Sequence, residues 1–378
     1  MAEDESRVLA INPGSTSTKF GVFTRRAAEW TSELAHPDHE LENFRGMSAL
    51  AQLDYRAQPL ANALNSAGYS CGRFAAIAGR GGLLPPMECG TYLVDDAMVE
   101  ELRRARRGEH ACNLGAVLAL KFAREAGVKA YVVDPPTVDE WQECARLSGS
   151  PLLPRTSVGH ALNTKAVARR YAAEAGRDYA SLRLIVVHMG SGITVSAHRS
   201  GKMIDNNSPQ EGPFGPDRTG SLPVQKLVAL CCSGAYNAKQ LDRMAFGEGG
   251  LFAYLGTRDL RVVEQRIAQG DAKAEAVHAA MVYQIAKEAG AMAAVLEGKV
   301  DAILLTGGMA FSERVVAGLR AMLGWIAPIH VYPGEDELRA LADGAFRVLE
   351  GEEAAKRMPA ASDLHDDSGR KRLVIGLE

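Results

Sequence analysis

The residues best suited to chemistry begin in a short polar loop of the segment INPGSTSTKFGVF, residues 11–23. A glycine is followed there by small hydroxyl residues, among them Ser15 and Ser17, and then by Lys19. A hairpin tip of this composition can point backbone N–H groups and hydroxyls at phosphate oxygens, as an anion nest does. Lys19 adds a cation, and Asn12 adds an oxygen for a hydrated metal ion. An ordinary polar turn has the same composition, so this loop alone leaves both interpretations open.

Two further glycine turns favour the phosphate interpretation. HMGSGIT at 188–194 repeats the order of strand, polar residue, glycine turn and strand, and LLTGGMA at 304–310 follows another apolar run. Three such turns indicate a site for a nucleotide polyphosphate. No GxxxxGK[ST] occurs, and no GxGxxG lies between a strand and a helix, which excludes P-loop and Rossmann sites. Phosphate-binding hairpins are instead typical of the actin-like and sugar-kinase superfamily of ATPases.

Isolated cations also stand in glycine-rich loops. Arg80 lies in GRGGLL after the apolar run FAAIA, and Arg218 lies in GPFGPDRTGSLP. A single loop arginine is usually a surface or ion-pair residue, but two planar guanidinium groups suit carboxylate and phosphoryl oxygens. His110, His160 and His188 stand beside glycines or at the edges of elements, where a structural histidine is the alternative. No HExxH or HxxxH spacing indicates a tightly held zinc ion.

Acidic candidates occur at two places. Asp134 ends the strand-like run AYVV before two prolines, where it either caps a turn or contacts a metal ion or substrate. Glu335, Asp336 and Glu337 together suit a helix N-terminus, where acidic charge is favourable. One of these three carboxylates could instead reach Mg²⁺.

The elements that must position these residues alternate along the chain. Strand-length apolar runs and amphipathic stretches follow one another, which predicts α/β layers with largely parallel sheets. Strands are expected at 7–12, 18–24, 74–79, 129–134, 183–188, 193–198, 301–306 and 329–332. Helices are expected at 58–67, 96–105, 113–126, 160–175, 258–269, 273–297, 313–323 and 336–350. A segment rich in Ser, Gly and Pro, RLSGSPLLPRTS, marks the expected domain boundary.

Length and composition fit a globular protein of two domains. The chain has 378 residues, of which 47% are hydrophobic and 24% charged. With 43 Lys and Arg against 46 Asp and Glu, the net charge of -3 gives no electrostatic reason for nucleic-acid or membrane partners. The six cysteines include no CxxC pair and are expected to be reduced thiols. The acidic start lacks a signal-peptide pattern, and the expected location is the cytoplasm.

Seven motifs occur in a characteristic order: AINPGSTSTK, GRGGLL, GEHACNLG, GHALNTKAVARR, HMGSGIT, EGPFGPDRTG and LLTGGMAFSE. Together they resemble the acetokinase family, most closely its butyrate kinase branch, over roughly residues 7–350. The resemblance implies two duplicated ribonuclease-H-like α/β domains flanking an active-site cleft, in a homodimer or higher homo-oligomer. An N-terminal domain would span 1–148 and be joined by the helix 337–350. The C-terminal nucleotide-binding and dimerisation domain would span 149–336, and 351–378 would form a loose tail.

The resemblance also implies a role for each matching position. Phosphate and nucleotide contacts would come from Asn12, Ser15, Ser17, Lys19, His188, Gly190, Gly192, Gly307 and Gly308. The catalytic residues would be Arg80, Arg218, His160 and Asp134. The acyl substrate would lie against Gly82, His110, Gly159 and Pro209. The metal ligands would be Asn12 and Asp336, with Glu335 and Glu337 as alternatives to Asp336.

The reaction implied is reversible transfer of the ATP γ-phosphoryl group to a short-chain fatty acid, with Mg²⁺ and ATP or ADP as cofactors. Gly82 and Gly159 stand where acetate kinases have a valine and an aromatic residue. We therefore expect an enlarged pocket that favours butyrate or branched C4–C5 acids.

Three alternatives remain open from the residues. An acetate or propionate kinase is the nearest one. A non-catalytic ATP-binding module of the same superfamily would lack the cations Arg80, Arg218 and His160. A sugar kinase would need an aspartate base for its hydroxyl acceptor, which Asp134 could supply.

Overall fold

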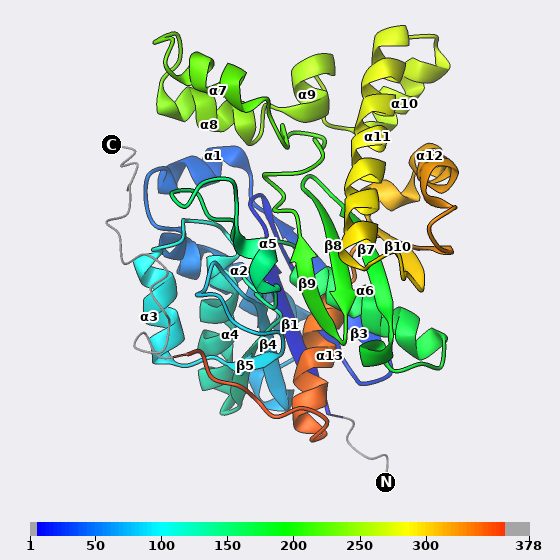
Figure 1. Cartoon of the computed structure of the whole chain (residues 1–378). Coiled ribbons are helices and arrows are strands. Elements are labelled where there is room, and N and C mark those ends of the chain that lie inside the picture. Colours follow the sequence, from blue (N-terminus) through cyan, green and yellow to red (C-terminus); the bar gives the residue numbers. More distant parts are fainter. Residues whose placement is uncertain (1–5, 360–378) are drawn as a thin grey trace. The chain divides into compact units, whose positions relative to one another are not determined.

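The computed structural model of the chain describes residues 6–359 (Figure 1). These residues form two compact units, which we describe one at a time. The first unit contains residues 6–139, 161–163 and 336–359, and the second contains residues 140–160 and 164–335. Most of the predicted tail, residues 360–378, lies outside the described residues.

A six-stranded sheet forms the centre of the first unit, in the order β3-β2-β1-β4-β6-β5. The strands are β1 (Val8–Pro13), β2 (Ser17–Phe23), β3 (Ala28–Ala35), β4 (Ala76–Arg80), β5 (Thr91–Leu93) and β6 (Lys129–Val133). Antiparallel β1 and β2 form a hairpin that closes at the pair Pro13 and Thr18. Strands β1, β4 and β6 are parallel, so their carboxyl ends meet at one edge of the sheet.

Helices cover both faces of this sheet. The main ones are α2 (Leu53–Ser66), α3 (Asp96–Arg104), α4 (Asn113–Ala126) and α13 (Glu337–Leu349), with the short α1 (Asp38–Leu41) beside them. Gly79 of β4 packs against Gly115 of α4. Val132 of β6 pairs with Gly79, so its side chain lies on the same face of the sheet. The next residue, Val133, therefore points to the opposite face, where it meets Gly344 of α13. Helices α4 and α13 therefore lie on opposite faces of the sheet.

The second unit has a five-stranded sheet in the order β11-β10-β7-β8-β9. Its strands are β7 (Arg183–Met189), β8 (Ile193–Arg199), β9 (Lys202–Asn206), β10 (Ala302–Gly307) and β11 (Ile329–Pro333). Its helices are α5 (Glu143–Arg146), α6 (Ala161–Glu174, of which 161–163 belong to the first unit), α7 (Val224–Cys231), α8 (Ala238–Ala245), α9 (Gly250–Leu255), α10 (Leu260–Ala268), α11 (Ala272–Val295) and α12 (Glu313–Leu323). Strands β7 and β8 form the second antiparallel hairpin, and β10 runs parallel to β7 and β11.

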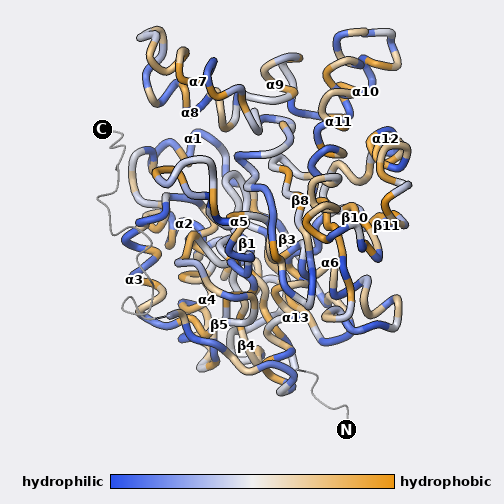
Figure 2. The backbone as a smooth tube through the Cα atoms, in the orientation of Figure 1, coloured by the Kyte–Doolittle hydropathy of each residue, from blue (hydrophilic) through white to orange (hydrophobic). Residues whose placement is uncertain are grey.

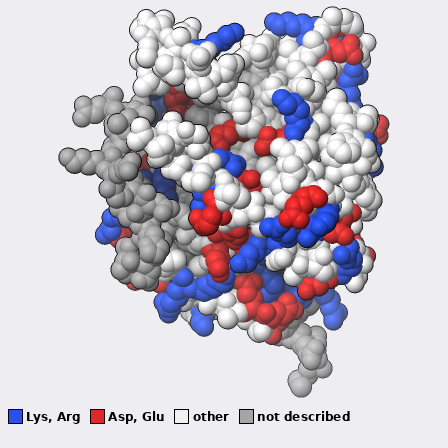
Figure 3. Space-filling model, in the orientation of Figure 1, with Lys and Arg blue, Asp and Glu red and all other residues white. Residues whose placement is uncertain are grey.

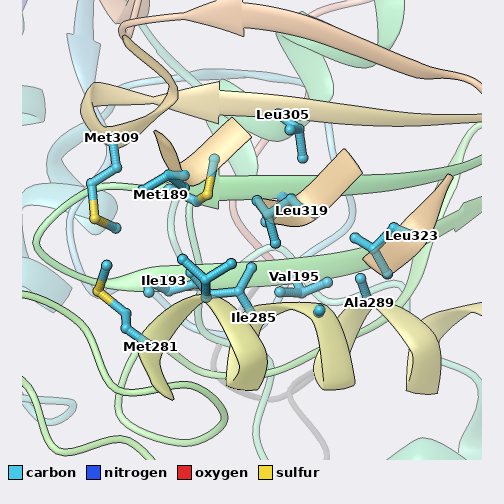
Figure 4. Close-up of a cluster of buried hydrophobic side chains, with 14 of the residues drawn as sticks. Met189, Ile193, Val195, Met281, Ile285, Ala289, Leu305, Met309, Leu319 and Leu323 are labelled. Carbon is cyan, nitrogen blue, oxygen red and sulfur yellow. The ribbon is translucent and has the colours of Figure 1, made fainter. Parts of the chain in front are cut away.

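A buried apolar cluster holds the second hairpin against the long helix α11. Figure 4 shows Met189, Ile193 and Val195 of the hairpin facing residues of α11 that include Ile285 and Ala289. Leu319 and Leu323 of α12 pack into the same cluster. Removing such side chains from water contributes about 25 cal/mol per Å² of apolar surface, so this packing stabilises the hairpin against α11.

The predicted α/β class is confirmed, but the expectation of largely parallel sheets is wrong. Each sheet is mixed, because both hairpins and the added strands β3, β5 and β9 pair in the antiparallel direction. Strand β3 was not predicted because its sequence, AEWTSELA, alternates exposed and half-buried residues and lacks an apolar run. Antiparallel strands of this kind need only one buried face.

Within residues 6–359, none of the helices combines the length and the apolar character that a membrane span requires. On the face drawn in Figure 3, basic and acidic side chains are interspersed. This pattern agrees with the near balance of charge in the sequence.

A glycine contact between β4 and α4 gives a test of the fold. A Cβ added to Gly79 would fall far inside the 3.0 Å that real Cβ atoms keep from other atoms, against the carbonyl oxygen of Gly115. We expect Gly79→Ala to lower the free energy of unfolding by about 1–3 kcal/mol or more. Gly290→Ala in α11 is the matched control, since nothing lies within 4 Å of its added Cβ. It should be neutral or stabilise by up to about 1 kcal/mol. Denaturant unfolding measures both, and an unchanged stability of Gly79→Ala would contradict the packing described.

Candidate functional site

The tip of the first hairpin is a tight turn between β1 and β2. The N–H group of Gly14 donates to the carbonyl of Ser17 over 2.7 Å, which closes the turn. Ser15 and Lys19 are exposed, and Ser17 is half-buried. The predicted phosphate-binding groups are therefore presented at the surface of the first unit.

Three side chains meet where β1, β4 and α13 come together. Asn12 donates from Nδ2 to the carboxylate of Glu337 over 2.5 Å, and Arg80 forms an ion pair with the same carboxylate oxygen. Arg80 also lies 3.5 Å from the Oδ1 atom of Asn12. This contact follows from the parallel pairing of β1 and β4. Asn12 and Arg80 lie near the carboxyl ends of these two neighbouring strands. Glu337 is the first residue of α13 and is 5% exposed.

The acidic triplet separates into three environments. Asp336 is exposed at the N-cap of α13, and its side chain makes no capping hydrogen bond. Glu335 belongs to the second unit, where its carboxylate lies 3.2 Å from Nε2 of His188. Glu337 contacts Asn12 within the first unit. Asp336, predicted as a metal ligand with Asn12, is thus exposed, while Glu337, one of the two alternatives left open by the sequence, lies beside Asn12.

The side chains of Asp134 and His110 each accept a backbone hydrogen bond in the first unit. Asp134 follows β6 with a left-handed φ of 38°, is buried, and accepts from the Gly90 N–H over 2.7 Å. This hydrogen bond ties the end of β6 to the segment before β5, and the predicted contact of Asp134 with a metal ion or substrate stays a prediction. His110 is exposed, and its Nδ1 accepts from the N–H of Cys112 over 3.2 Å, just before α4.

Neighbouring side chains lie close to the two glycines that were expected to enlarge the acyl pocket. A Cβ on Gly82 would lie 2.5 Å from Oδ1 of Asn113 and 2.7 Å from Leu102. A Cβ on Gly159 would lie 3.1 Å from Nδ2 of Asn206 and 3.2 Å from Cγ2 of Thr194. Neighbouring atoms thus lie close to both glycines, more tightly at Gly82 than at Gly159, and the enlarged pocket stays a prediction.

The second hairpin carries an arginine against its glycine turn. Gly190 donates to the carbonyl of Gly192 over 3.2 Å. A Cβ on Gly192 would lie 2.6 Å from Nη1 of Arg218 and 2.8 Å from Pro209, so the glycine permits this close approach. Burial lowers the pKa of Arg218, and the neighbouring Asp217 opposes this effect. An arginine stays protonated at physiological pH even when its pKa is lowered.

Two histidines stack beside this hairpin. The rings of His160 and His188 lie 3.8 Å apart with an interplanar angle of 14°. The Nδ1 atom of His160 lies 2.9 Å from Oγ1 of Thr194, a fully buried residue of β8. Thr194 thereby orients the ring that the resemblance assigns to the transition state. The sequence did not single out Thr194, because a threonine within an apolar strand gives no signal.

The third glycine turn packs onto the second hairpin. Gly307 and Gly334 exchange backbone hydrogen bonds of 3.1 and 3.0 Å. Gly307 has a φ of 89°, and a Cβ there would lie 2.5 Å from the carbonyl oxygen of Met189. Gly308, the next residue, is exposed. The structure therefore brings Gly190, Gly192 and Gly307 together within the second unit.

Comparison of the chain with known proteins shows which family it resembles. The model of the acetokinase family matches residues 155–324. A "Probable butyrate kinase" from Clostridium botulinum (strain Alaska E43 / Type E3) is 46% identical over 352 residues, which cover 93% of this chain and 99% of that protein. The protein of the same description from strain Eklund 17B / Type B matches with the same identity and coverage.

Solved structures of low sequence identity share the fold. An acetate kinase from Porphyromonas gingivalis aligns with a TM-score of 0.76 and 18% identity, covering 91% of this chain and all of that one. A propionate kinase from Francisella tularensis subsp. tularensis SCHU S4 gives a TM-score of 0.73 and 17% identity, covering 90% of this chain and 98% of that one. The 46% identity to the Clostridium proteins over nearly the whole chain settles the relationship that the seven motifs predicted. The chain belongs to the acetokinase family.

Proposed function

We propose that this chain is a kinase that reversibly transfers the γ-phosphoryl group of ATP to the carboxylate of a short-chain fatty acid. The products are an acyl phosphate and ADP, and butyrate or a branched C4–C5 acid is the favoured substrate. The structural observation that carries the proposal is the cluster of Asn12, Arg80 and Glu337 beside the first phosphate hairpin. The 46% identity to proteins described as butyrate kinases supports the choice of acid.

The proposed reaction requires neutralisation of charge and no proton transfer. A fatty acid with a pKa of about 4–5 is ionised at neutral pH and needs no general base. Its oxygen forms a bond to the γ-phosphorus as the bond to the ADP oxygen breaks, and no proton moves. Because an anion attacks an anion, the residues must neutralise charge and align the reactants. We assign this task to Arg80, Arg218 and His160, with Lys19 at the phosphates.

Asn12 and Glu337 fit the binding of Mg²⁺. Within residues 6–359 no group of three or more His, Cys, Asp or Glu side chains could hold a metal ion on its own. Mg²⁺ usually takes one or two carboxylates together with substrate phosphates and water, so an amide oxygen and one buried carboxylate are an adequate donor set. The metal would supply positive charge to the phosphate oxygens.

The preference for four or five carbons rests on the relatives and on burial energy. Gly82 and Gly159, which the sequence linked to an enlarged pocket, have neighbouring side chains close to them and are not needed for this support. Each buried methylene contributes about 0.8 kcal/mol, so butyrate gains about 1.6 kcal/mol over acetate, roughly tenfold. An acetate or propionate kinase therefore remains the second candidate.

Assembly, domains and location are further parts of the proposal. We propose a cytoplasmic homodimer or higher homo-oligomer, in which the C-terminal domain over 149–336 binds nucleotide and dimerises. Helices α7 and α8 bury no residue, and Val224 and Val228 are 72% and 56% exposed. Figure 2 shows hydrophobic residues in both helices. Exposed apolar patches of this kind often mark a contact surface.

A series of acids tests the proposed reaction. Purified enzyme with MgATP and acetate, propionate, butyrate, valerate, isobutyrate or isovalerate should form acyl phosphates, which hydroxylamine traps. We expect the largest kcat/KM at four or five carbons, about tenfold above acetate. A maximum at acetate would overturn the chain-length assignment and keep the kinase. No product with any acid, despite ATP binding, would favour the non-catalytic ATP-binding alternative.

Two neighbouring carboxylates test the metal assignment. Glu337→Gln keeps the size of the buried side chain but removes its charge, so we expect turnover to fall by about 100-fold or more. The Mg²⁺ concentration needed for half-maximal rate should rise as well. Asp336→Asn is the matched control and should stay within about twofold of the unmodified enzyme, because Asp336 is exposed. The opposite pattern, with Asp336→Asn inactive and Glu337→Gln normal in its Mg²⁺ dependence, would contradict the assignment.

A further inference from the structure

A buried arginine lies directly beneath the tip of the first phosphate hairpin. Arg56 of α2 is fully buried. Its Nη1 donates to the carbonyl oxygens of Gly14 and Ser17 over 2.8 and 3.3 Å, and its Nη2 donates to the carbonyl oxygen of Ser15 over 3.3 Å. Nη1 also donates to Oγ1 of Thr18 over 3.1 Å. One guanidinium group therefore contacts most of the loop that joins β1 to β2.

The positive charge of Arg56 has only neutral hydrogen-bond partners. Besides the hairpin it donates to the amide oxygen of Gln52, from Nε over 3.0 Å and from Nη2 over 2.8 Å. Among residues 6–359 no carboxylate forms an ion pair with it. Arginine is almost never fully buried unless it is paired, so this unneutralised cation needs an explanation.

The hydrogen bonds to the carbonyl groups determine where the neighbouring N–H groups point. In a planar trans peptide the C=O of one residue and the N–H of the next point in opposite directions. The carbonyls of Gly14 and Ser15 are directed at Arg56, so the N–H groups of Ser15 and Thr16 point away from it. Both of these residues are exposed. The hairpin thus presents amide donors outward, with a positive charge behind them.

The histidine and the glutamate near Arg56 do not neutralise its positive charge. Nε2 of His36 lies 2.8 Å from Oγ1 of Thr18. Burial, together with Arg56, lowers the pKa of His36 to about 4, so the ring is neutral at physiological pH. Glu40, the acidic residue nearby, accepts a hydrogen bond from the hydroxyl of Tyr55 over 2.5 Å.

We propose that Arg56 is a positioning residue for phosphate binding: it orients the outward N–H groups of the hairpin tip and adds positive charge beneath the bound phosphate. The inference rests on the proposed function, because it takes the ligand to be the phosphate chain of ATP. An anion in front of the tip would supply the negative charge that the buried guanidinium lacks among the described residues.

A purely structural role is the competing explanation, and a second arginine provides its control. Arg339 of α13 donates to the carbonyl oxygen of Thr24 over 3.0 Å and also to that of Arg25. It thus ties down the loop at the opposite end of β2, away from the hairpin tip. Arg339→Met should cost stability without changing nucleotide affinity.

The test compares Arg56→Met, Arg56→Lys and Arg339→Met in the full-length enzyme. The measurements are the free energy of unfolding, the Kd of MgAMPPNP by calorimetry, and the KM values for MgATP and butyrate. We expect Arg56→Met to weaken MgAMPPNP binding and raise the KM for MgATP by about tenfold or more, with the KM for butyrate within about twofold. Arg56→Lys keeps the charge but loses the planar fork and should lie between Arg56→Met and the unmodified enzyme. Arg339→Met should bind MgAMPPNP normally.

Each possible result of this test supports or overturns the proposal for Arg56. A folded Arg56→Met variant with an unchanged Kd for MgAMPPNP would overturn the proposal. If Arg56→Met does not fold, Arg56→Lys carries the test: MgAMPPNP binding weakened by about threefold or more supports the proposal, and unchanged binding overturns it. Unmodified enzyme that binds MgAMPPNP but forms no acyl phosphate would remove the proposed reaction and leave the binding test of Arg56 intact.

Discussion

Repulsion between an ionised acid and the phosphates of ATP is the main obstacle in the proposed reaction, and the cationic residues are proposed to offset it. Each of the two predicted phosphate hairpins has an arginine close to it. Arg80 stands beside Asn12 at the end of the strand next to β1, and Arg218 lies against Gly192 of the second hairpin. Arg56 adds a third cation beneath the first hairpin. For a reaction that moves no proton, positive charge in defined positions is the main requirement.

The buried carboxylate of Glu337 links this requirement to the fold. It is the first residue of α13, and α13 packs on the face of the sheet opposite to α4. The position of the helix thus determines where the carboxylate meets Asn12 and Arg80. An unpaired carboxylate at this depth would be costly, and the ion pair with Arg80 compensates for it. Close packing of the first unit and the geometry of the site are therefore connected.

The sequence predicted the local features well, and the distant contacts poorly. Both hairpins and most helices carry periodic apolar patterns, and the seven ordered motifs identified the family. Glu337 meets Asn12 across 325 positions, so one acidic residue could not be chosen from three neighbours by pattern alone. Arg56 looks like any helical arginine until the structure places it under a loop 42 positions away.

The predicted acyl pocket shows a different limit of the sequence. Glycine at positions 82 and 159 indicates that a larger side chain is absent there. The sequence does not show which residues lie beside each glycine. Asn113 and Thr194, from elements that come later in the chain, lie close to the positions that a Cβ on these glycines would take. Packing of this kind depends on tertiary contacts, which composition and spacing do not encode directly.

The most direct test of the central claim follows the oxygen atoms of the acid. The account holds that a carboxylate oxygen attacks the γ-phosphorus of ATP. Butyrate labelled with oxygen-18 in its carboxylate, incubated with MgATP and enzyme, should give butyryl phosphate with the heavy isotope in the oxygen that bridges carbon and phosphorus. Phosphorus NMR detects that bridging atom by its isotope shift, and ADP is the expected second product. Formation of AMP and pyrophosphate, or of phosphate without labelled acyl phosphate, would contradict the account.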